Sequence, residues 1–176
     1  GPSTLRIRQH LPSTCHIIGV DTSSSMVERC KSNMTRDHSS ATAEIRLQSL
    51  QETHIENASI VVLNYTLQFI PDNERLKILT HIARGLVPGG ILILSEKIRF
   101  VDEAIQSATT ELHHAFKKHQ GYSDLEIAQK RASLENVLVP NTLEQHQERL
   151  RDAGFISSDM FLKCFNFVSL IAIKQR

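Results

Sequence analysis

An acidic residue closes the first long apolar run of the chain. Residues 15–21, CHIIGVD, are rich in β-branched side chains, which is typical of a strand buried on both faces. A carboxylate at the end of such a strand can accept hydrogen bonds from the 2′- and 3′-hydroxyls of a nucleoside ribose. Acids at strand ends also serve simply as helix N-caps. The pattern alone leaves both interpretations of Asp21 open.

A second apolar run ends on a polar residue. Residues 58–64, ASIVVLN, close on Asn64. The segment 86–90, LVPGG, then ends a predicted helix and leads into a third apolar run over residues 91–95. In open α/β sheets, ligands bind beyond the carboxyl ends of the strands. We therefore expect Asp21 and Asn64 at the edge where a nucleoside ligand would lie.

The later half of the chain carries a guanidinium and two adjacent imidazoles. Arg131 can bind a carboxylate through two parallel hydrogen bonds, although a solvated helix charge beside Lys130 is the commoner role. His113 and His114 point about 100° apart on a helix, so they cannot comfortably share one metal ion. We expect structural or pocket-lining roles for both and no metal site. Core or interface packing is expected for Phe69, Phe116, Phe161, Phe165 and Phe167.

Strand and helix patterns alternate along the chain and indicate an α/β fold. Strands are expected at residues 15–21, 44–47, 58–64 and 91–95, and as a hairpin over 160–174 interrupted at 164–166. Helices are expected up to residue 10, from Met26 onward, and over 71–86, 102–119, 124–136 and 142–153. This order predicts a mostly parallel sheet with helices on both faces and a terminal antiparallel strand.

Composition indicates one soluble domain over residues 1–176. The chain has 20 Lys and Arg against 19 Asp and Glu, a formal net charge of +1. Proteins that bind nucleic acid or membrane surfaces concentrate basic residues, so neither partner is expected. Apolar runs stay far below the roughly 18 residues of a membrane span. The three cysteines, without a CxxC pair, are expected as reduced thiols in a cytoplasmic protein.

The LVPGG segment and the strand after it are similar to a signature of class I S-adenosyl-L-methionine-dependent methyltransferases. Longer blocks closely resemble the carboxy-S-adenosyl-L-methionine synthase family, a relative of those enzymes. The blocks are residues 56–69 (ENASIVVLNYTLQF), 94–97 (LSEK), 121–123 (GYS), 129–131 (QKR), 134–137 (LENV) and 164–167 (CFNF). The resemblance extends from Thr4 to Lys174.

The resemblance implies a Rossmann-like, three-layer α/β domain with a helical lid over residues 102–136. It implies a cytoplasmic homodimer that converts S-adenosyl-L-methionine and prephenate into carboxy-S-adenosyl-L-methionine and phenylpyruvate. In this family, the product supplies the carboxymethyl group for tRNA wobble uridine through a separate transferase. A functional link to that transferase is implied, and direct binding of nucleic acid is not.

Family positions carry over residue by residue. The resemblance implies that Asp21 and Thr22 contact the ribose and adenosine, and that Asn64 contacts the cofactor at the end of its strand. Arg131 matches the arginine that pairs with the new carboxylate, which makes it the expected catalytic residue.

Two departures from the family pattern bear on activity. Ser49 and Leu50 replace an Asp-Ile pair in the cofactor-binding loop that meets the adenine, and a hydroxyl accepts less strongly than a carboxylate but can also donate. The family's first strand and glycine-rich turn would precede Ser3. We therefore expect an N-terminally incomplete domain, with impaired cofactor binding and little turnover if these 176 residues act alone.

Two other functions stay open. An ordinary S-adenosyl-L-methionine-dependent methyltransferase would share the fold, although a methyl donor does not need Arg131. A catalytically inactive homologue would act in oligomerisation or in docking to the tRNA-modifying partner. The two enzymes would release different products, and the inactive homologue would release none.

Overall fold

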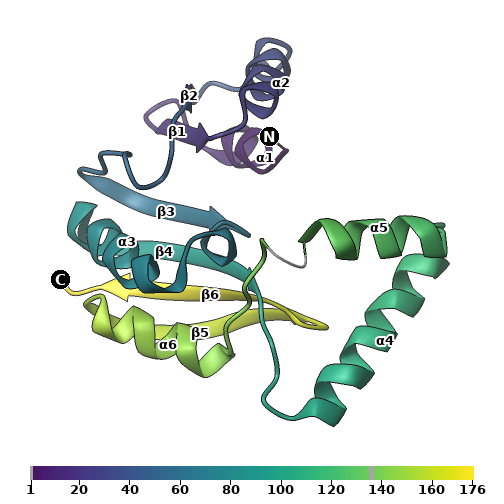
Figure 1. The fold of residues 1–176 in the computed structure, drawn as a ribbon. Helices are drawn as coiled ribbons and strands as arrows, with labels where there is room; N and C mark the ends of the chain where they lie inside the picture. Colours follow the sequence, from purple (N-terminus) through teal and green to yellow (C-terminus); the bar gives the residue numbers. More distant parts are fainter. Residues whose placement is uncertain (1, 135–136) are drawn as a thin grey trace. The chain divides into compact units, whose positions relative to one another are not determined.

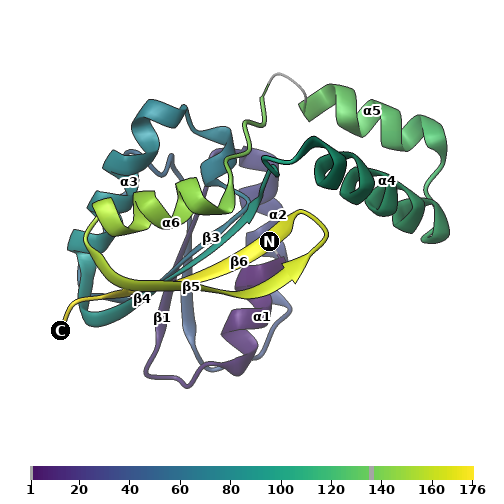
Figure 2. The same ribbon diagram turned by 90° about the horizontal axis from the view of Figure 1, so that it is seen from below.

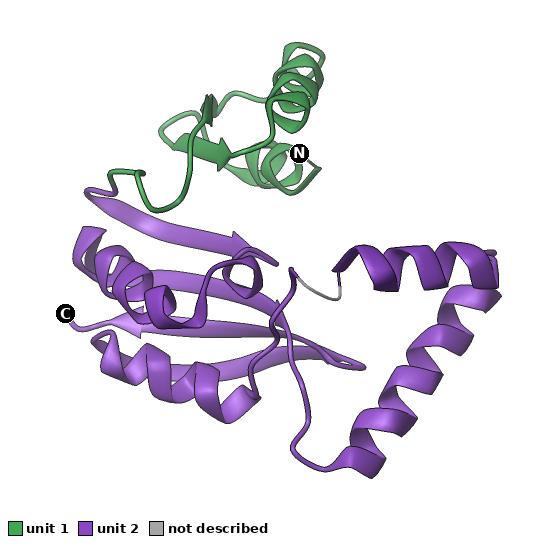
Figure 3. Cartoon of the chain, in the orientation of Figure 1, with its two compact units in different colours: residues 1–54 green, residues 55–176 purple. Residues whose placement is uncertain are grey.

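The computed structural model describes residues 2–134 and 137–176, which fall into two compact units. Unit 1 covers residues 1–54 and unit 2 covers residues 55–176 (Figure 3). No helix in the described part of the chain is long and apolar enough to cross a membrane. Cys15, Cys30 and Cys164 are free thiols, as predicted.

Unit 1 is built around two parallel strands (Figure 1). Its elements are α1 (Pro2–His10), β1 (His16–Asp21), α2 (Ser24–Thr35) and β2 (Thr42–Leu47). Asp21 at the end of β1 lies opposite Leu47 at the end of β2. The helix α2 starts where the serine-rich segment allows, because the Ser23 hydroxyl caps it by accepting the backbone N–H of Met26 at 3.4 Å.

Unit 2 contains a four-stranded mixed sheet in the order β3-β4-β6-β5. Its elements are β3 (Ala58–Asn64), the 3-10 helix η1 (Leu67–Phe69), α3 (Asp72–Gly85), β4 (Leu86–Lys97), α4 (Glu103–His119), α5 (Asp124–Leu134), α6 (Leu143–Asp152), β5 (Phe155–Cys164) and β6 (Phe167–Lys174). β3 and β4 are parallel, whereas β6 is antiparallel to both β4 and β5. Helices α3 and α6 lie side by side on one face of this sheet (Figures 1 and 2). The α/β class and the terminal hairpin are confirmed.

Three strands begin earlier than predicted, and β2 is the least shifted of them, starting at Thr42 rather than at Glu44. Because α3 already ends at Gly85, β4 starts at Leu86, and the Pro88-Gly89-Gly90 segment lies inside a strand rather than before it. The strand accommodates this segment through a register shift opposite residues 58–60. Gly89 has a φ of 75°, which glycine adopts without steric penalty. The hairpin strand β5 likewise starts at Phe155 rather than at Met160.

Helices α4 and α5 form an arm that extends away from the sheet of unit 2 (Figure 1). Asp102 caps α4 by accepting the backbone N–H of Ile105 at 3.0 Å. In the described part of the arm, Ile127 of α5 is buried and α4 has no buried residue. Large apolar side chains of the arm are therefore exposed, namely Ile105, Leu112, Phe116, Tyr122 and Leu125. The predicted end of α5 at Asn136 lies outside the described residues.

Candidate functional site

Unit 1 gathers four of the predicted site residues at the carboxyl ends of its two strands. Asp21 ends β1, and its backbone oxygen accepts the N–H of Gln48 at 3.0 Å, just beyond the end of β2. This bond brings the Asp21-Thr22 turn beside the Ser49-Leu50 loop. The Asp21 carboxylate accepts the backbone N–H of Ser23 through Oδ1 at 2.9 Å. Its second oxygen has no partner among the described residues, so it is available to a ribose hydroxyl.

The Ser49 hydroxyl is oriented by a carboxylate that the sequence analysis did not single out. Ser49 Oγ donates to Glu52 Oε2 at 2.8 Å, and the Ser49 backbone oxygen accepts from the Thr53 hydroxyl at 2.7 Å. Because its proton is directed to Glu52, Ser49 Oγ presents lone pairs that can accept from an amino group. The Glu52 carboxylate thus lies beside Ser49 in the loop expected to meet the adenine.

Unit 2 places Asn64 at the carboxyl end of β3, beside the end of β4. Asn64 is exposed and lies opposite Ser95 in the parallel register. The next residue, Tyr65, has a φ of 52° and donates its backbone N–H to the oxygen of Ser95 at 2.8 Å. The chain therefore turns sharply directly after Asn64, at the edge where the sequence analysis expected a ligand.

A buried glutamate holds the segment that follows this turn. The Glu96 carboxylate has no exposed surface and accepts the backbone N–H groups of Leu67 and Gln68 at 2.9 and 3.0 Å. The Gln68 side chain in turn accepts the backbone N–H of Lys97 at 3.0 Å. Burial raises the pKa of Glu96 from 4.5 to about 7, against the lowering effect of these hydrogen bonds. Glu96 is thus a positioning residue for η1 and the turn after Asn64.

The raised pKa of Glu96 predicts a pH dependence of stability. The folded chain binds a proton at Glu96 more tightly than the unfolded chain, so the contribution of Glu96 to stability is present below the unfolded pKa of 4.5 and falls as the pH rises to about 7. We expect a decrease of about 2–3 kcal/mol in the free energy of unfolding across this window. Urea unfolding at several pH values, with Glu96→Gln as the comparison, measures it. Parallel curves for the two proteins would contradict the prediction.

A second buried charge, Arg75 of α3, joins two segments near the site. Its guanidinium donates to the backbone oxygens of Ile70 and Val139, both at 2.9 Å, and to the side-chain oxygen of Asn141. Residues 139–141 lie on the segment that returns from the arm to the sheet. The hydrogen bonds of Arg75 therefore link the loop after η1 to the segment that returns from the arm. Arg75 falls within the predicted helix over residues 71–86, and its local sequence indicates no role.

Arg131 lies in the last turn of α5 and is exposed. Lys97 is the last residue of β4, and burial lowers its pKa most. The positive charges of Lys117 and Arg131 lower this pKa further. The arm therefore brings Arg131 to the same end of the unit 2 sheet as Asn64. Asp21 and Ser49, with the residues that follow them, belong to unit 1.

His113 packs against two phenylalanines, whereas other phenylalanines are exposed. The His113 ring lies 5.5 Å from that of Phe165 and 5.1 Å from that of Phe167, in agreement with the expected role. Phe69 and Phe161 are 45% and 59% exposed, so neither belongs to the core. Over residues 2–134 and 137–176, no group of three or more His, Cys, Asp or Glu side chains is placed to hold a metal ion.

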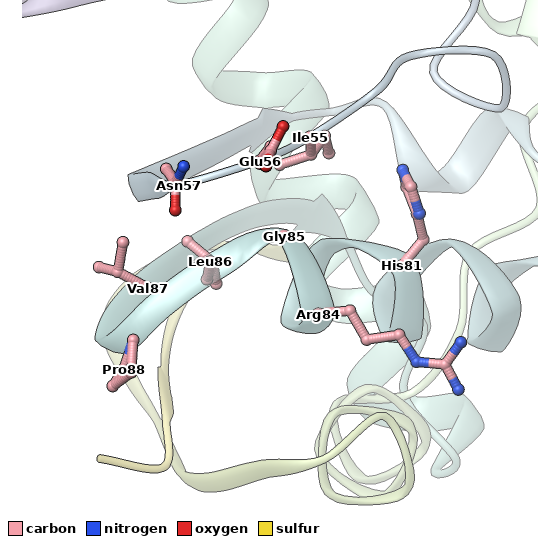
Figure 4. Close-up of a pocket in the computed structure, with 9 residues that line it drawn as sticks. All are labelled: Ile55, Glu56, Asn57, His81, Arg84, Gly85, Leu86, Val87 and Pro88. Atoms are coloured by element: carbon pink, nitrogen blue, oxygen red, sulfur yellow. The ribbon is translucent and has the colours of Figure 1, made fainter.

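A pocket of about 260 Å³ lies elsewhere in unit 2, at the amino ends of β3 and β4 (Figure 4). It is lined by Ile55, Glu56, Asn57, His81, Arg84, Gly85, Leu86, Val87 and Pro88. Gly85 is required there, because a Cβ atom would overlap the backbone oxygen of Ile55. The predicted ligand residues of unit 2 lie at the carboxyl end of β3 and on the arm, so this pocket is not part of the predicted site.

Comparison with known proteins gives one family. A family model described as "Methyltransferase domain" matches residues 1–90. The chain is 49% identical to carboxy-S-adenosyl-L-methionine synthase of Haemophilus ducreyi, over 99% of this chain and 72% of that protein. It is 53% identical to the synthase of Hahella chejuensis, over 99% of this chain and 73% of that protein.

Solved structures share the fold at low sequence identity. A putative O-methyltransferase from Nostoc punctiforme matches with a TM-score of 0.70 and 19% identity, over 97% of this chain and 47% of that one. Human N-acetylserotonin methyltransferase in complex with SAM matches with a TM-score of 0.59 and 15% identity, over 92% of this chain and 40% of that one. The chain thus spans about half the length of these structural neighbours. The likeness confirms the predicted Rossmann-like methyltransferase fold.

Proposed function

The chain belongs to the carboxy-S-adenosyl-L-methionine synthase family, and we propose that it makes carboxy-S-adenosyl-L-methionine from S-adenosyl-L-methionine and prephenate. The observation that carries this proposal is about 50% identity to named synthases over 99% of the chain. The positions of Asn64 and Arg131 at one end of the unit 2 sheet support it.

The reaction couples two sets of bond changes. The ring carboxylate of prephenate leaves as carbon dioxide, and the freed electron pair makes the ring aromatic as the C4 hydroxide departs, which gives phenylpyruvate. The positive sulfur of S-adenosyl-L-methionine acidifies its methyl group, so the hydroxide takes one methyl proton and becomes water. The ylide carbon then forms a bond to carbon dioxide, and the product carries a new carboxylate.

The residues of the site divide this work between binding and stabilisation. We assign the free oxygen of Asp21, together with Thr22, to the ribose, and Ser49 and Leu50 to the adenine. Asn64 is assigned to the cofactor at the end of β3. Arg131 is assigned to the new carboxylate, because a guanidinium matches the two carboxylate oxygens with parallel hydrogen bonds.

The decisive experiment is mass spectrometry of small molecules released by denaturing the purified protein. Carboxy-S-adenosyl-L-methionine in the extract, or its formation from added substrates, would support the proposal. S-adenosyl-L-methionine alone, with methyl transfer to an acceptor and no carboxylated product, would favour an ordinary methyltransferase, the class of the domain model that matches residues 1–90. Absence of any bound nucleoside and of turnover would favour an inactive homologue.

We further propose a cytoplasmic homodimer whose product is used by a separate tRNA-modifying transferase. The apolar side chains of the arm support the dimer, because Leu112 and Leu125 are 61% and 67% exposed and exposed apolar surface of this kind favours association. The arm carries Arg131, so a second copy packed there would also order the carboxylate site. Light scattering on the purified protein measures the mass, and a monomer at micromolar concentration would contradict the dimer.

Ser49 offers a test of the adenine contact. Ser49→Ala is expected to weaken binding of S-adenosyl-L-methionine about 3- to 10-fold, because one hydrogen bond of about 0.5–1.5 kcal/mol is lost. Titration calorimetry measures the change, with the exposed Ser40→Ala as the matched control. Unchanged affinity in Ser49→Ala would mean that this hydroxyl does not touch the ligand.

A further inference from the structure

Four rings meet at the carboxyl end of the unit 2 sheet and form what we call the ring cluster: Tyr65, His113, Phe165 and Phe167. The ring of Phe167 lies 5.7 Å from that of Tyr65, edge-on, and 5.1 Å from that of His113. The ring of Phe165 lies 5.5 Å from that of His113. The rings come from the residue after β3, from α4, and from the β5–β6 turn with the start of β6, and α4 passes close to this turn (Figure 2). Three separate segments thus build one aromatic surface directly after Asn64.

A lysine stands on the same face as this surface. Lys97 lies opposite Phe167 in the antiparallel register of β4 and β6. Residues paired in this way project from the same side of a sheet, with Cβ atoms about 5 Å apart. The half-buried side chain of Lys97 therefore starts beside the ring cluster. Its neighbour Glu96 projects to the opposite side, where backbone N–H groups occupy both of its oxygens.

The charge of Lys97 lies among other positive charges. Burial and then Lys117 and Arg131 lower the pKa of Lys97, and no carboxylate pairs with its ammonium among the described residues. Burial, Lys117 and Lys97 lower the pKa of His113 to about 4, so its ring is neutral at neutral pH. Lys117 and Arg131 thus place further positive charge near Lys97, and a bound anion would offset this charge.

An aromatic surface edged by cations fits one class of ligand, a carboxylate attached to a flat unsaturated ring. We infer that the ring cluster and Lys97 form the subsite for the co-substrate prephenate, with its ring against Phe167 and its pyruvyl carboxylate on Lys97. This inference rests on the proposed function. It adds a cation for the carboxylate that stays with the ring, whereas Arg131 serves the carboxylate that is transferred.

The two carboxylates of prephenate explain why two separate cations are needed. The ring carboxylate is lost as carbon dioxide and becomes a carboxylate again only on the former methyl carbon, so Arg131 is its partner in the product. The pyruvyl carboxylate leaves with phenylpyruvate, so its partner must release it. Lys97, on a β-strand, and Arg131, on the arm, occupy different elements and can hold the two groups apart.

Phenylpyruvate separates the two roles, because it has the ring and the pyruvyl carboxylate but lacks the transferred one. Lys97→Met is expected to weaken phenylpyruvate binding at least about 10-fold, the effect of losing one charge-assisted hydrogen bond. It should raise the KM for prephenate similarly and leave the Kd of S-adenosyl-L-methionine within twofold. Lys97→Arg should restore most of the binding. Lys163→Met, which removes a lysine that lies over the Phe100 ring, is the matched control and should bind normally.

A measurement on the unaltered protein does not depend on how the variants fold. Phenylpyruvate should slow acetylation of Lys97 and leave that of Lys163 unchanged. Normal phenylpyruvate binding by Lys97→Met, or no protection of Lys97, in a protein that makes carboxy-S-adenosyl-L-methionine would overturn this inference and leave the proposed function intact. A protein that neither binds phenylpyruvate nor makes this product would overturn both.

Discussion

Arg131→Met is expected to lower kcat/KM for carboxy-S-adenosyl-L-methionine formation about 100-fold. A charge-assisted, two-pronged bond to a carboxylate contributes up to about 3 kcal/mol, and the carboxylate exists fully only after the new bond has formed. The loss should therefore appear mainly in kcat. The purified protein, with S-adenosyl-L-methionine and prephenate, provides the assay, and mass spectrometry quantifies the product.

Two comparisons make the Arg131 prediction specific. Arg131→Lys keeps the charge but loses the planar pair of donors, so its kcat/KM should lie between those of Arg131→Met and the unaltered protein. Lys130→Met removes the adjacent charge of the same exposed helix and should change kcat/KM less than about twofold. Equal losses in the Arg131 and Lys130 variants would show that general positive charge, rather than a carboxylate contact, is responsible.

The elements were predictable because each rests on a local pattern. Residues 58–64 form an unbroken apolar run that ends on Asn64, and β3 has these same bounds. The hairpin around Phe165 followed from two apolar runs and a short break, and Phe165 adopts a φ of 53° at the turn. The start of β4 was missed, because proline and glycine usually interrupt structure, whereas here a register shift keeps them in the strand.

The charged core of unit 2 could not be predicted from sequence. Glu96 and Arg75 look like surface residues, since isolated charges are rarely buried. Their partners are backbone groups of η1 and a side chain, Asn141, that lies 66 positions beyond Arg75. Only the fold brings these groups together. The role expected for Arg131 comes from a family resemblance, because its local sequence favours a solvated charge.

Arg75→Leu is expected to give the largest loss of stability, about 3–5 kcal/mol in the free energy of unfolding. The side chain is fully buried, and burial lowers its pKa even though Asp72 opposes this effect. Removing it leaves the oxygens of Ile70 and Val139 without this donor, whereas Asn141 Oδ1 still accepts from Arg149 at 3.1 Å. Buried acceptors without partners each cost about 1–3 kcal/mol. Urea unfolding followed by circular dichroism measures the loss.

Arg84→Leu is the matched control for Arg75→Leu, because it changes the same residue type in the same helix at an exposed position. Its effect should stay within about 0.5 kcal/mol. Arg75 also fixes the loop after η1 to the segment that returns from the arm, so Arg75→Leu should release Arg131 from its place near Lys97. At temperatures where the variant is still folded, kcat should therefore fall while S-adenosyl-L-methionine binds as before. A variant that loses stability but keeps its kcat would show that Arg75 does not hold Arg131 in place.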